Sequence, residues 1–412
     1  MEDQDRDHIS SRSHFSGRSE QELDEMLDEL RAGKIGINQP GQNSSEHDSE
    51  DTPEENDNAS GTGNAAKSKK GKSRKEGFNL KDEVISWIQV LVAAAIIAFC
   101  VNHFIIANSE VPTSSMETTI MAGDRVIGSR LSYKFGAPQR GDIAIFIYPD
   151  DEAKGIKTYY VKRIIGMPGD TIEIRDNQVY IDGVAAKNPE KMQLNYFVET
   201  DGSMLSEEQF RLLDVSKADR VLIDGSYNPQ YMSMLNIQPN ANGQYNPIYH
   251  FPLTQKTLEV AKKLPVVKRV VLEPDPVGTD SYYPVDYQTG WSRDNYGPLW
   301  IPKKGTTIPL TERNIALYKR CIVNYEHNKL EVKDSKVYIN GKPETTYTFK
   351  YDYYWMMGDN RHNSADSRSW GFVPEDHIVG KPIMIWLSLD KDRSLFDGGI
   401  RWNRMFRWVH PD

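Results

Sequence analysis

The candidate nucleophile of this chain is a serine in a short polar turn. Ser114 and Ser115 are adjacent in VPTSSMETTI, residues 111–120, a stretch that contains no histidine. A serine hydroxyl is a weak nucleophile until a neighbouring base takes its proton. Ser115 precedes an apolar residue, Met116, which could line a pocket while the hydroxyl faces a cleft. The competing interpretation is a solvated loop, and a base elsewhere in the chain decides between the two.

The candidate base is Lys162, which lies 47 residues further along the chain. Its segment, KTYYVKRIIG (157–166), is typical of a strand, in which Tyr160, Lys162 and Ile164 share one face. Burial of a lysine on such a face lowers its pKa from ~10.4 toward neutrality. A neutral amine can deprotonate a serine hydroxyl, as in serine–lysine variants of the catalytic triad. The alternative is a lysine with a buried stem and its ammonium in water.

A dense polar segment supplies groups that could hold such a pair in place. MMGDNRHNSADSRSWGFV, residues 356–373, contains two aspartates and two arginines, and arginine–carboxylate pairs are rigid and bidentate. Ser364 in this segment is suited to orient a lysine amine through a hydrogen bond. A solvated loop has a similar composition, but this density of opposite charges favours a buried hydrogen-bond network.

The elements that position these residues are expected to be β-strands. From residue 108 onward, short runs rich in β-branched and aromatic residues, such as DIAIFIYP and TYTFKYDYYWM, are separated by Gly, Pro, Asp and Asn. Apolar and polar positions alternate, which is typical of antiparallel strands. A helical pattern is confined to short pieces such as residues 206–221 and 253–264. The fold class is therefore mainly β, with an antiparallel β-sheet catalytic core.

Two similar hairpins bracket an insertion. IEIRDNQVYIDG (172–183) and LEVKDSKVYING (330–341) match position by position, and their central D-N-Q and D-S-K and closing Asp-Gly and Asn-Gly are turn signals. We interpret them as two hairpins with the same turn chemistry rather than as a duplicated domain. Residues 190–328, rich in aromatics, Pro, Gly and Asn, are expected to form a second, loop-rich lobe inserted into the core.

One apolar run is long enough to span a membrane. VISWIQVLVAAAIIAFCV begins at residue 84, and the apolar character extends to residue 107, which meets the roughly 20 residues that a spanning helix needs. A buried core helix would show a polar face, and a cleaved signal peptide would begin much nearer the N-terminus. The six basic residues of KSKKGKSRK (67–75) predict a cytoplasmic N-terminus and an exported chain after residue 108.

The net charge of −9 arises largely from the N-terminal tail. Residues 1–66 are rich in Asp, Glu, Ser, Asn and Gly, and such a segment buries too little apolar surface to offset its ordering entropy. The tail is therefore expected to be mostly disordered. The basic residues 67–75 are too few and too near the apolar run for a nucleic-acid site, so no nucleic-acid partner is expected.

No metal or other cofactor is expected. Cys100 lies in the apolar run and Cys321 outside it, so an intrachain disulfide is not expected. No CxxC pair or Cys/His spacing suggests zinc, and none of the nine histidines lies in an HExxH frame.

Four segments resemble bacterial type I signal peptidases, the membrane-bound serine–lysine endopeptidases that remove signal peptides from exported proteins. In order, and all after the apolar run, they are PTSSMETTIMAGDRVI (112–127), RGDIAIF (140–146), YYVKRIIGMPGD (159–170) and GDNRHNSADSRSWGFV (358–373). The C-terminal GGIRWNRMFRW (398–408) resembles the end of some of these enzymes, and its tryptophans could either contact lipid headgroups or pack on the core. The chain departs from the family after Met116, where a frequent proline is missing.

The resemblance implies a role for each matching residue. Ser115 is the nucleophile, Lys162 is the general base, and Thr113 joins the backbone N–H of Ser115 in the oxyanion hole. The residues that orient the base and brace the site are Ser364, Asp359, Arg361, Asp366 and Arg368, the last two as an ion pair. The positions that shape the small substrate pockets are Val111, Met116, Ile120, Tyr160 and Val161.

The resemblance also implies the reaction and its setting. The enzyme would cut N-terminal signal peptides from preproteins after small residues, Ala-x-Ala. It would be a single-pass protein of the bacterial inner membrane with a cytoplasmic N-terminus and a periplasmic or exterior catalytic domain, in contact with lipid and near the export machinery. The expected segments are a tail ending in the basic cluster (1–80), an anchor (81–108), a core in two parts (109–189 and 329–397), the lobe (190–328) and a basic, Trp-rich C-terminus (398–412).

Two other classes of protein fit parts of the sequence. A serine–lysine autoprotease of the repressor type shares the core chemistry, but it carries a DNA-binding unit and lacks an anchor. A non-catalytic, membrane-anchored β scaffold would have lost Ser115 or Lys162, and both are present. Labelling by a serine-directed acylating inhibitor separates an enzyme from a scaffold.

Overall fold

The chain divides into two units, residues 25–98 and the remainder, and each is described by itself. The computed structural model describes residues 80–100, 106–223, 232–233, 235–240, 242–275, 282–285, 287–390, 393 and 398–410. The tail and basic cluster that the sequence predicts within residues 1–79 lie outside the described residues.

Within the smaller unit, the structure describes helix α2 (Leu80–Cys100). The last two residues of this helix, Phe99 and Cys100, lie just beyond the end of that unit at Ala98. The 21 residues of the helix correspond to about 30 Å at 1.5 Å per residue. The window Glu83–Cys100 has a mean hydropathy of 2.1, and none of it is buried. Trp87, Leu91 and Phe99 are each 64% exposed. Within the described residues this is the one helix long and apolar enough to cross a membrane, at the place where the sequence predicts an anchor.

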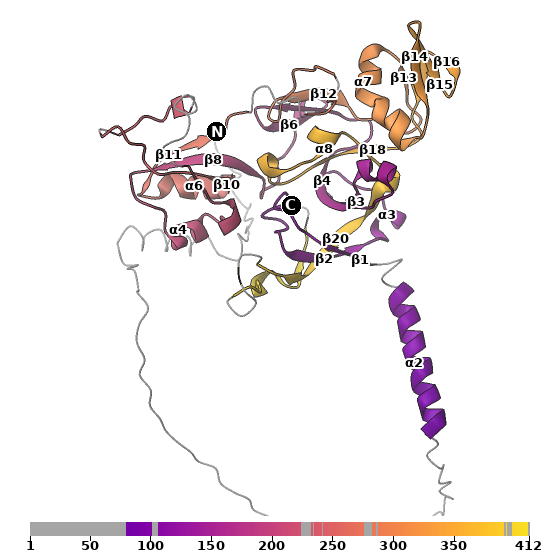
Figure 1. Cartoon of the computed structure of the whole chain (residues 1–412), viewed down its shortest axis with the longest axis horizontal. Coiled ribbons are helices and arrows are strands. Elements are labelled where there is room, and N and C mark those ends of the chain that lie inside the picture. Colours follow the sequence, from indigo (N-terminus) through magenta and orange to yellow (C-terminus); the bar gives the residue numbers. More distant parts are fainter. Residues whose placement is uncertain are drawn as a thin grey trace, which may run out of the picture. The chain divides into compact units, whose positions relative to one another are not determined.

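The larger unit is built on an eight-stranded antiparallel sheet (Figure 1). Its order is β1 (Ile106–Glu110), β2 (Asp124–Ser129), β20 (Ile378–Ser388), β3 (Ile143–Ile147), β4 (Tyr159–Gly166), β18 (Tyr353–Met357) and β19 (Val373–Pro374), with β21 (Arg407–Trp408) also paired to β20. The mainly β, antiparallel fold class predicted from the sequence is confirmed.

Apolar clusters cover both faces of this sheet at β3. In β3, Ile143 and Ile145 join one apolar cluster, whereas Ala144 and Phe146 join another on the opposite face. Successive side chains of a strand point to opposite faces, so a continuous apolar run such as IAIFI (143–147) contributes to two cores. Short helices close the connections: α3 (Ser132–Phe135), η2 (Pro149–Lys154), α8 (Ser367–Trp370), η6 (Glu375–His377) and η7 (Trp402–Arg404).

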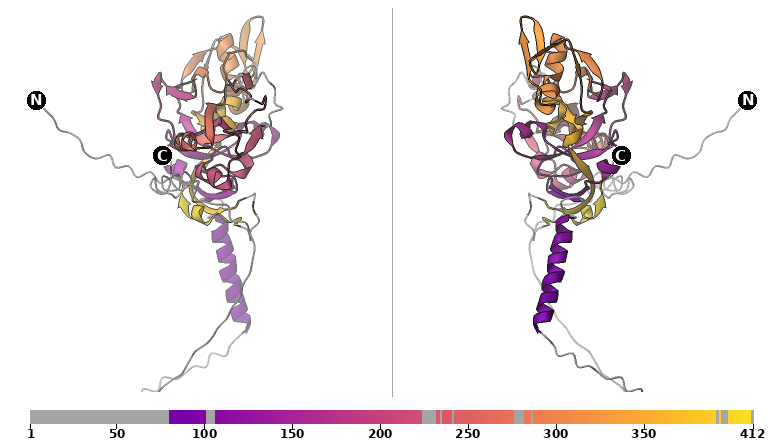
Figure 2. Two further views of the ribbon diagram at one scale, coloured as in Figure 1. Left: turned by 90° about the vertical axis from the view of Figure 1, so that its left-hand side faces the viewer. Right: turned by 90° about the vertical axis from the view of Figure 1, so that its right-hand side faces the viewer.

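The two similar hairpins form separate sheets. The first is β5 (Thr171–Arg175), β6 (Gln178–Ile181) and β7 (Val184–Ala185), and the second is β14 (Leu330–Lys333), β15 (Lys336–Ile339) and β16 (Lys342–Glu344). Their predicted turns are confirmed: Asp176–Asn177 and Asp334–Ser335 both have positive φ, the backbone of a type I′ turn. Figure 2 shows the second hairpin at one end of the larger unit.

Residues 190–328, which the sequence sets apart as one lobe, contribute to more than one layer. β8 (Gln193–Thr200), β9 (Val221–Ile223), β10 (Ile248–Thr254) and β11 (Val267–Leu272) form their own sheet with α4 (Glu207–Leu212), η3 (Lys217–Asp219) and α6 (Gln255–Lys263). Beyond it, β12 (Tyr296–Trp300) pairs with β5, and β13 (Thr307–Pro309) pairs with β17 (Thr346–Thr348). α7 (Glu312–Arg320) and the π-helix η4 (Cys321–Tyr325) pack into one apolar core together with residues of the hairpin strands β5, β6 and β15.

The predicted helix 206–221 is shorter than expected, because α4 ends at Leu212 and Asp214 has a φ of +55°, which is not helical. The chain then forms η3 before β9 begins at Val221. Ser206 and Thr254 begin α4 and α6 as reciprocal capping boxes, which satisfy the first free N–H groups of each helix.

Strand order explains how distant residues meet. The segment 111–123 connects β1 to β2, Lys162 lies in the middle of β4, and residues 358–372 connect β18 to β19. Because β18 runs antiparallel to β4 and pairs Met357 with Arg163, the loop after β18 begins beside Lys162.

Candidate active site

The hydroxyl of Ser115 and the amine of Lys162 are in direct contact. Lys162 Nζ donates to Ser115 Oγ at 2.6 Å and to the Val161 carbonyl at 3.2 Å. Both residues are buried, at 5% and 4% exposed. A base within ~2.6–3.2 Å of a hydroxyl can take its proton directly. The structure therefore brings together the two residues that the sequence pairs across 47 positions.

Burial changes the acidity of Lys162. Desolvation lowers its pKa to about 8, against the opposing effect of the Asp366 and Asp359 carboxylates. Nζ also lies 5.6 Å from the ring centre of Tyr160, the neighbour on the same strand face. A larger fraction of this amine than of an exposed lysine is therefore neutral near physiological pH, and the neutral amine is the form that a general base requires.

The loop after β18 holds the backbone of the serine segment. The Asn360 N–H donates to the Ser115 carbonyl at 3.1 Å, and Asn360 Nδ2 donates to the Ser114 carbonyl at 3.3 Å. The segment also closes on itself, because the Ile120 N–H donates to the Met116 carbonyl at 2.8 Å. Ser115 is thus fixed by both its side chain and its backbone. Thr113, at the exposed edge, places Oγ1 3.3 Å from Ser115 Oγ.

Gly358 allows this close approach of two backbones. A Cβ on Gly358 would lie 2.4 Å from the Ser115 carbonyl oxygen and 2.3 Å from Ser364 Oγ. Contacts below 3.0 Å force a shift, and here one of the two atoms is backbone. Any side chain at this position therefore displaces the serine segment from the loop.

Gly358→Ala is expected to lower the rate of peptide cleavage by roughly 100-fold, the scale of a displacement of about 1 Å at a reacting group. The measurement is kcat/KM on a preprotein in detergent. Gly183→Ala is the matched control, because its φ of +79° is also strained for alanine but nothing lies within 4 Å of the added Cβ. Equal activity of the two variants would contradict the packing argument.

A buried ion pair joins the loop to β4. Arg163 donates to Asp359 through Nε (2.8 Å) and Nη2 (2.7 Å), and Thr119 Oγ1 donates to the same carboxylate at 2.6 Å. Burial opposes the charge of Asp359, but Arg163 outweighs it, and the pKa of Asp359 is lowered. The sequence predicts Asp359 as a bracing residue but does not predict Arg163. The position of Arg163 directly after the candidate base Lys162 was a usable signal.

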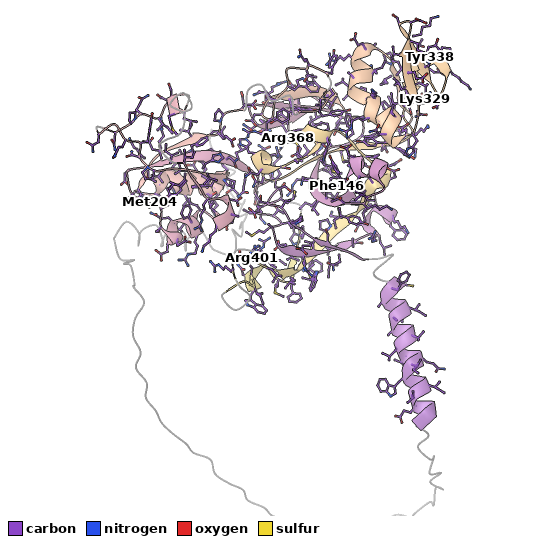
Figure 3. The ribbon with its side chains drawn as sticks, in the orientation of Figure 1. Phe146, Met204, Lys329, Tyr338, Arg368 and Arg401 are labelled. Atoms are coloured by element: carbon purple, nitrogen blue, oxygen red, sulfur yellow. The ribbon has the colours of Figure 1, made fainter. Side chains whose placement is uncertain are left out.

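A second buried ion pair closes the loop on itself. Arg368 donates to both oxygens of Asp366 at 2.9 and 2.8 Å, and Asp366 also accepts the Gly358 N–H at 3.1 Å. Arg361 donates to the Gly358 carbonyl at 3.2 Å, and burial together with Arg368 lowers the pKa of Arg361 to about 10. Figure 3 shows Arg368 well inside the larger unit.

Ser364 does not have the partner that the sequence predicts. The hydrogen bonds of the Lys162 amine within the described residues go to Ser115 and Val161, not to Ser364. The loop turns back over Gly358, so the buried hydroxyl of Ser364 lies against that glycine and beside Asp366, whose pKa it helps to lower.

The predicted pocket residues fall into two adjacent clusters. Four of them pack together in one buried apolar cluster: Val111, Met116, Ile120 and Val161. Tyr160 instead packs on the opposite cluster with Phe146 and Tyr148, because neighbouring residues of β4 face opposite sides. Met116 and Ile120 are 0% exposed, so they form the floor beneath Ser115 rather than an open surface.

The C-terminal segment supports the serine segment from the other side, which the sequence does not predict. Arg404 donates to Asp124 at 2.6 Å and to the Thr119 carbonyl at 3.3 Å, and Arg401 donates to the Ala122 carbonyl at 2.9 Å. Three aromatic residues of this segment are exposed: Trp402, Phe406 and Trp408.

Comparison with known proteins adds independent evidence. The family model described as signal peptidase, peptidase S26, matches residues 84–227 and 344–387. Signal peptidase I of Buchnera aphidicola from Acyrthosiphon pisum is 26% identical over 351 residues, 81% of this chain and 83% of that protein. Signal peptidase IB of Staphylococcus aureus strain COL is 28% identical over 151 residues, 36% of this chain and 74% of that protein.

These matches, together with the buried serine, define the class of the protein as a serine endopeptidase. The chain is similar to signal peptidase I along most of its length, and it matches the peptidase S26 family model over two segments.

Proposed function

We propose that this protein removes signal peptides from exported preproteins by a Ser115/Lys162 dyad mechanism. The observation that carries the proposal is the 2.6 Å hydrogen bond between two buried side chains, Lys162 Nζ and Ser115 Oγ. The similarity to signal peptidase I supports the reaction, and the geometry supports the assignment of the dyad.

The chemistry proceeds in two steps. Neutral Lys162 takes the proton of Ser115 as Oγ attacks the scissile carbonyl, and the resulting ammonium protonates the leaving amine. The acyl-enzyme is then hydrolysed by a water that Lys162 deprotonates. The Ser115 N–H and the Thr113 hydroxyl stabilise the oxyanion in both steps, and one such donor is typically worth about 3–4 kcal/mol.

The surrounding residues take supporting roles in this proposal. Asp359, Arg361, Asp366 and Arg368 keep the 358–368 loop rigid, and Ser364 acts through Asp366. The buried cluster of Val111, Met116, Ile120 and Val161 limits the space beneath the nucleophile, which favours small residues before the cut. Tyr160 flanks Lys162 from the other cluster.

Cleavage is expected to rise with pH through the titration of Lys162. The amine must be neutral, and its pKa is lowered to about 8. Below that value kcat/KM should fall about tenfold per pH unit, and above it the rate should level off. The measurement is kcat/KM on a signal-peptide substrate from pH 5 to pH 10. A rate that stays flat below pH 7 would contradict a lysine base.

The chain is proposed to be anchored in the inner membrane by α2. The helix has the length and the continuous apolar surface for this role, and the basic residues before it favour a cytoplasmic N-terminus. The catalytic unit would then work on the periplasmic or exterior side, near the export machinery. The exposed Trp402, Phe406 and Trp408 suit contact with lipid headgroups, where tryptophan is enriched.

Covalent labelling tests the assignment of the nucleophile. A serine-directed acylating inhibitor should modify the full-length protein in detergent, and mass spectrometry should locate the adduct on Ser115. Ser115→Ala should show no adduct and no preprotein cleavage, whereas Ser114→Ala should retain both. An adduct on another serine, or cleavage by Ser115→Ala, would refute the dyad.

A further inference from the structure

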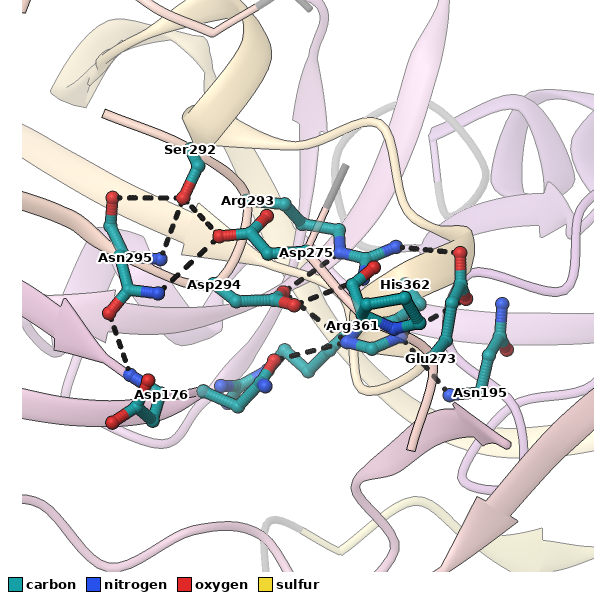
Figure 4. A network of polar contacts seen from close by, with 12 residues as sticks. Asp176, Asn195, Glu273, Asp275, Ser292, Arg293, Asp294, Asn295, Arg361 and His362 are labelled. Carbon is teal, nitrogen blue, oxygen red and sulfur yellow. Dashed lines mark hydrogen bonds and ion pairs between the residues drawn. The ribbon is translucent and has the colours of Figure 1, made fainter. Parts of the chain in front are cut away.

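A second polar network includes residues of the loop after β18 (Figure 4). Its centre is His362, which belongs to the loop after β18 and lies two residues after Asn360. The network joins this loop to three other parts of the chain: β8, the segment that follows β11, and the turn between β5 and β6.

The imidazole of His362 is enclosed on both sides. Its side chain is 0% exposed. Nδ1 accepts the Asn195 N–H at 3.2 Å and lies 3.3 Å from Glu273 Oε2. Nε2 lies 3.0 Å from Asn177 Oδ1 and 3.3 Å from Asp294 Oδ1. Both ring nitrogens are thus engaged, which fixes the position of the ring and of the backbone that carries it.

The two carboxylates around the ring are held in the charged form. Burial opposes ionisation of Glu273, but contacts with His250, His362 and Arg293 outweigh it, and the pKa of Glu273 is lowered. Burial likewise opposes ionisation of Asp294, and contacts with His362 and Arg293 lower its pKa to about 2. Arg293 bridges the two, at 3.2 Å from Glu273 and 2.8 Å from Asp294. Satisfied polar networks of this kind make the groups that they hold rigid.

The start of β8 runs along the same loop. The Gln193 N–H donates to the Asp359 carbonyl at 2.8 Å. The side-chain amides of Asn195 and Asn363 exchange two hydrogen bonds of 3.1 Å each. The loop is therefore attached to the inserted sheet through Asp359, His362 and Asn363, and His362 also reaches the β5–β6 turn.

This attachment continues to the nucleophile. Between the His362 clamp and the serine lies Asn360, whose N–H and side chain bind the Ser115 and Ser114 carbonyls. We propose that His362 is a positioning residue of the peptidase: by clamping the loop between the inserted sheet and the β5–β6 turn, it sets the position of Ser115 against Lys162. The inference rests on the proposed function of these two residues.

His362→Asn tests the clamp. Asparagine can still accept the Asn195 N–H, but its side chain ends short of Asp294 and Asn177. In the full-length protein in detergent, kcat should fall roughly 10- to 100-fold, the scale of a small misplacement of a reacting group, while KM changes less than about twofold. The rate of acylation by a serine-directed inhibitor should fall by the same factor as kcat. His362→Gln, whose amide reaches further, should recover part of both rates.

His250→Asn is the matched control, because His250 Nε2 contacts Glu273 at 3.2 Å in the same network but belongs to β10 and not to the loop. It should show a similar loss of thermal stability with kcat unchanged. Wild-type kcat and acylation in both His362 variants would overturn the proposal, as would an equal loss of kcat in His250→Asn. If His362→Asn does not fold, the rates of His362→Gln decide alone. Failure of the wild type to be acylated at Ser115 would instead overturn the proposed function.

Discussion

Replacing Lys162 with methionine is expected to abolish preprotein cleavage while leaving the fold intact. Groups that act as a catalytic unit each lower kcat by on the order of 10⁴-fold or more when removed. Lys162 Nζ is the one side-chain amine bonded to Ser115 Oγ among the described residues. The measurement is the cleavage rate of a purified preprotein in detergent. Lys157→Met, at an exposed position just before β4, is the control and should retain wild-type activity.

The same variant should be more stable than the wild type at neutral pH. The folded pKa of Lys162, about 8, lies below its ordinary value, so below pH 8 the wild type bears the full cost of a buried charge. That cost declines as the pH rises from the folded toward the unfolded pKa of ~10.4, and methionine does not bear it. Thermal unfolding at pH 7 and pH 10 measures this. A lower melting temperature for the variant at pH 7 would contradict the burial argument.

Combining Ser115→Ala with Lys162→Met separates a dyad from two independent effects. If the lysine acts only by deprotonating the serine, the double variant should be no less active than either single variant. A further loss in the double variant would show that one residue contributes to cleavage without the other.

The dyad could be predicted from the sequence because its signals are local. Ser115 lies in a turn before an apolar residue, and Lys162 occupies a position in an apolar strand where a charge is unfavourable. The hairpin turns could be predicted for a similar reason, since Asp-Asn and Asp-Gly adopt the positive φ that type I′ turns require. In each case the residues that determine the structure are neighbours in the chain.

The partners of the buried charges could not be predicted, because they depend on strand order. Asp359 pairs with Arg163, 196 positions away, only because β18 lies next to β4. The Ser364 hydroxyl is a group that could bind the Lys162 amine, but its loop folds over Gly358 and places this hydroxyl beside Asp366. The contact of β8 with the loop 359–363 likewise follows from where the inserted sheet packs. Each of these contacts depends on packing between residues far apart in the chain, and no local sequence pattern predicts such packing.

Asp359→Asn is expected to reduce both stability and activity. Arg163 and Asp359 are 3% and 1% exposed, and removing one charge leaves the other buried without compensation. Such a change typically costs about 3–5 kcal/mol of unfolding free energy. Because the pKa of Asp359 is lowered, its contribution is fully present above the unfolded pKa of ~3.9, so the loss should be complete at pH 7. Urea unfolding of the variant and the wild type at pH 7 gives the measurement.

A double replacement separates the effect of the Arg163–Asp359 ion pair on stability from its effect on activity. Arg163→Met combined with Asp359→Leu removes both charges, and apolar replacement of a buried ion pair is often neutral for stability. Activity should remain low, because Thr119 loses the carboxylate that it binds at 2.6 Å and the loop loses its tie to β4. Glu259→Gln breaks an ion pair whose side chains are about half exposed, and it should change stability by less than about 1 kcal/mol. Recovery of full activity by the double variant would mean that the ion pair stabilises the fold without positioning Ser115.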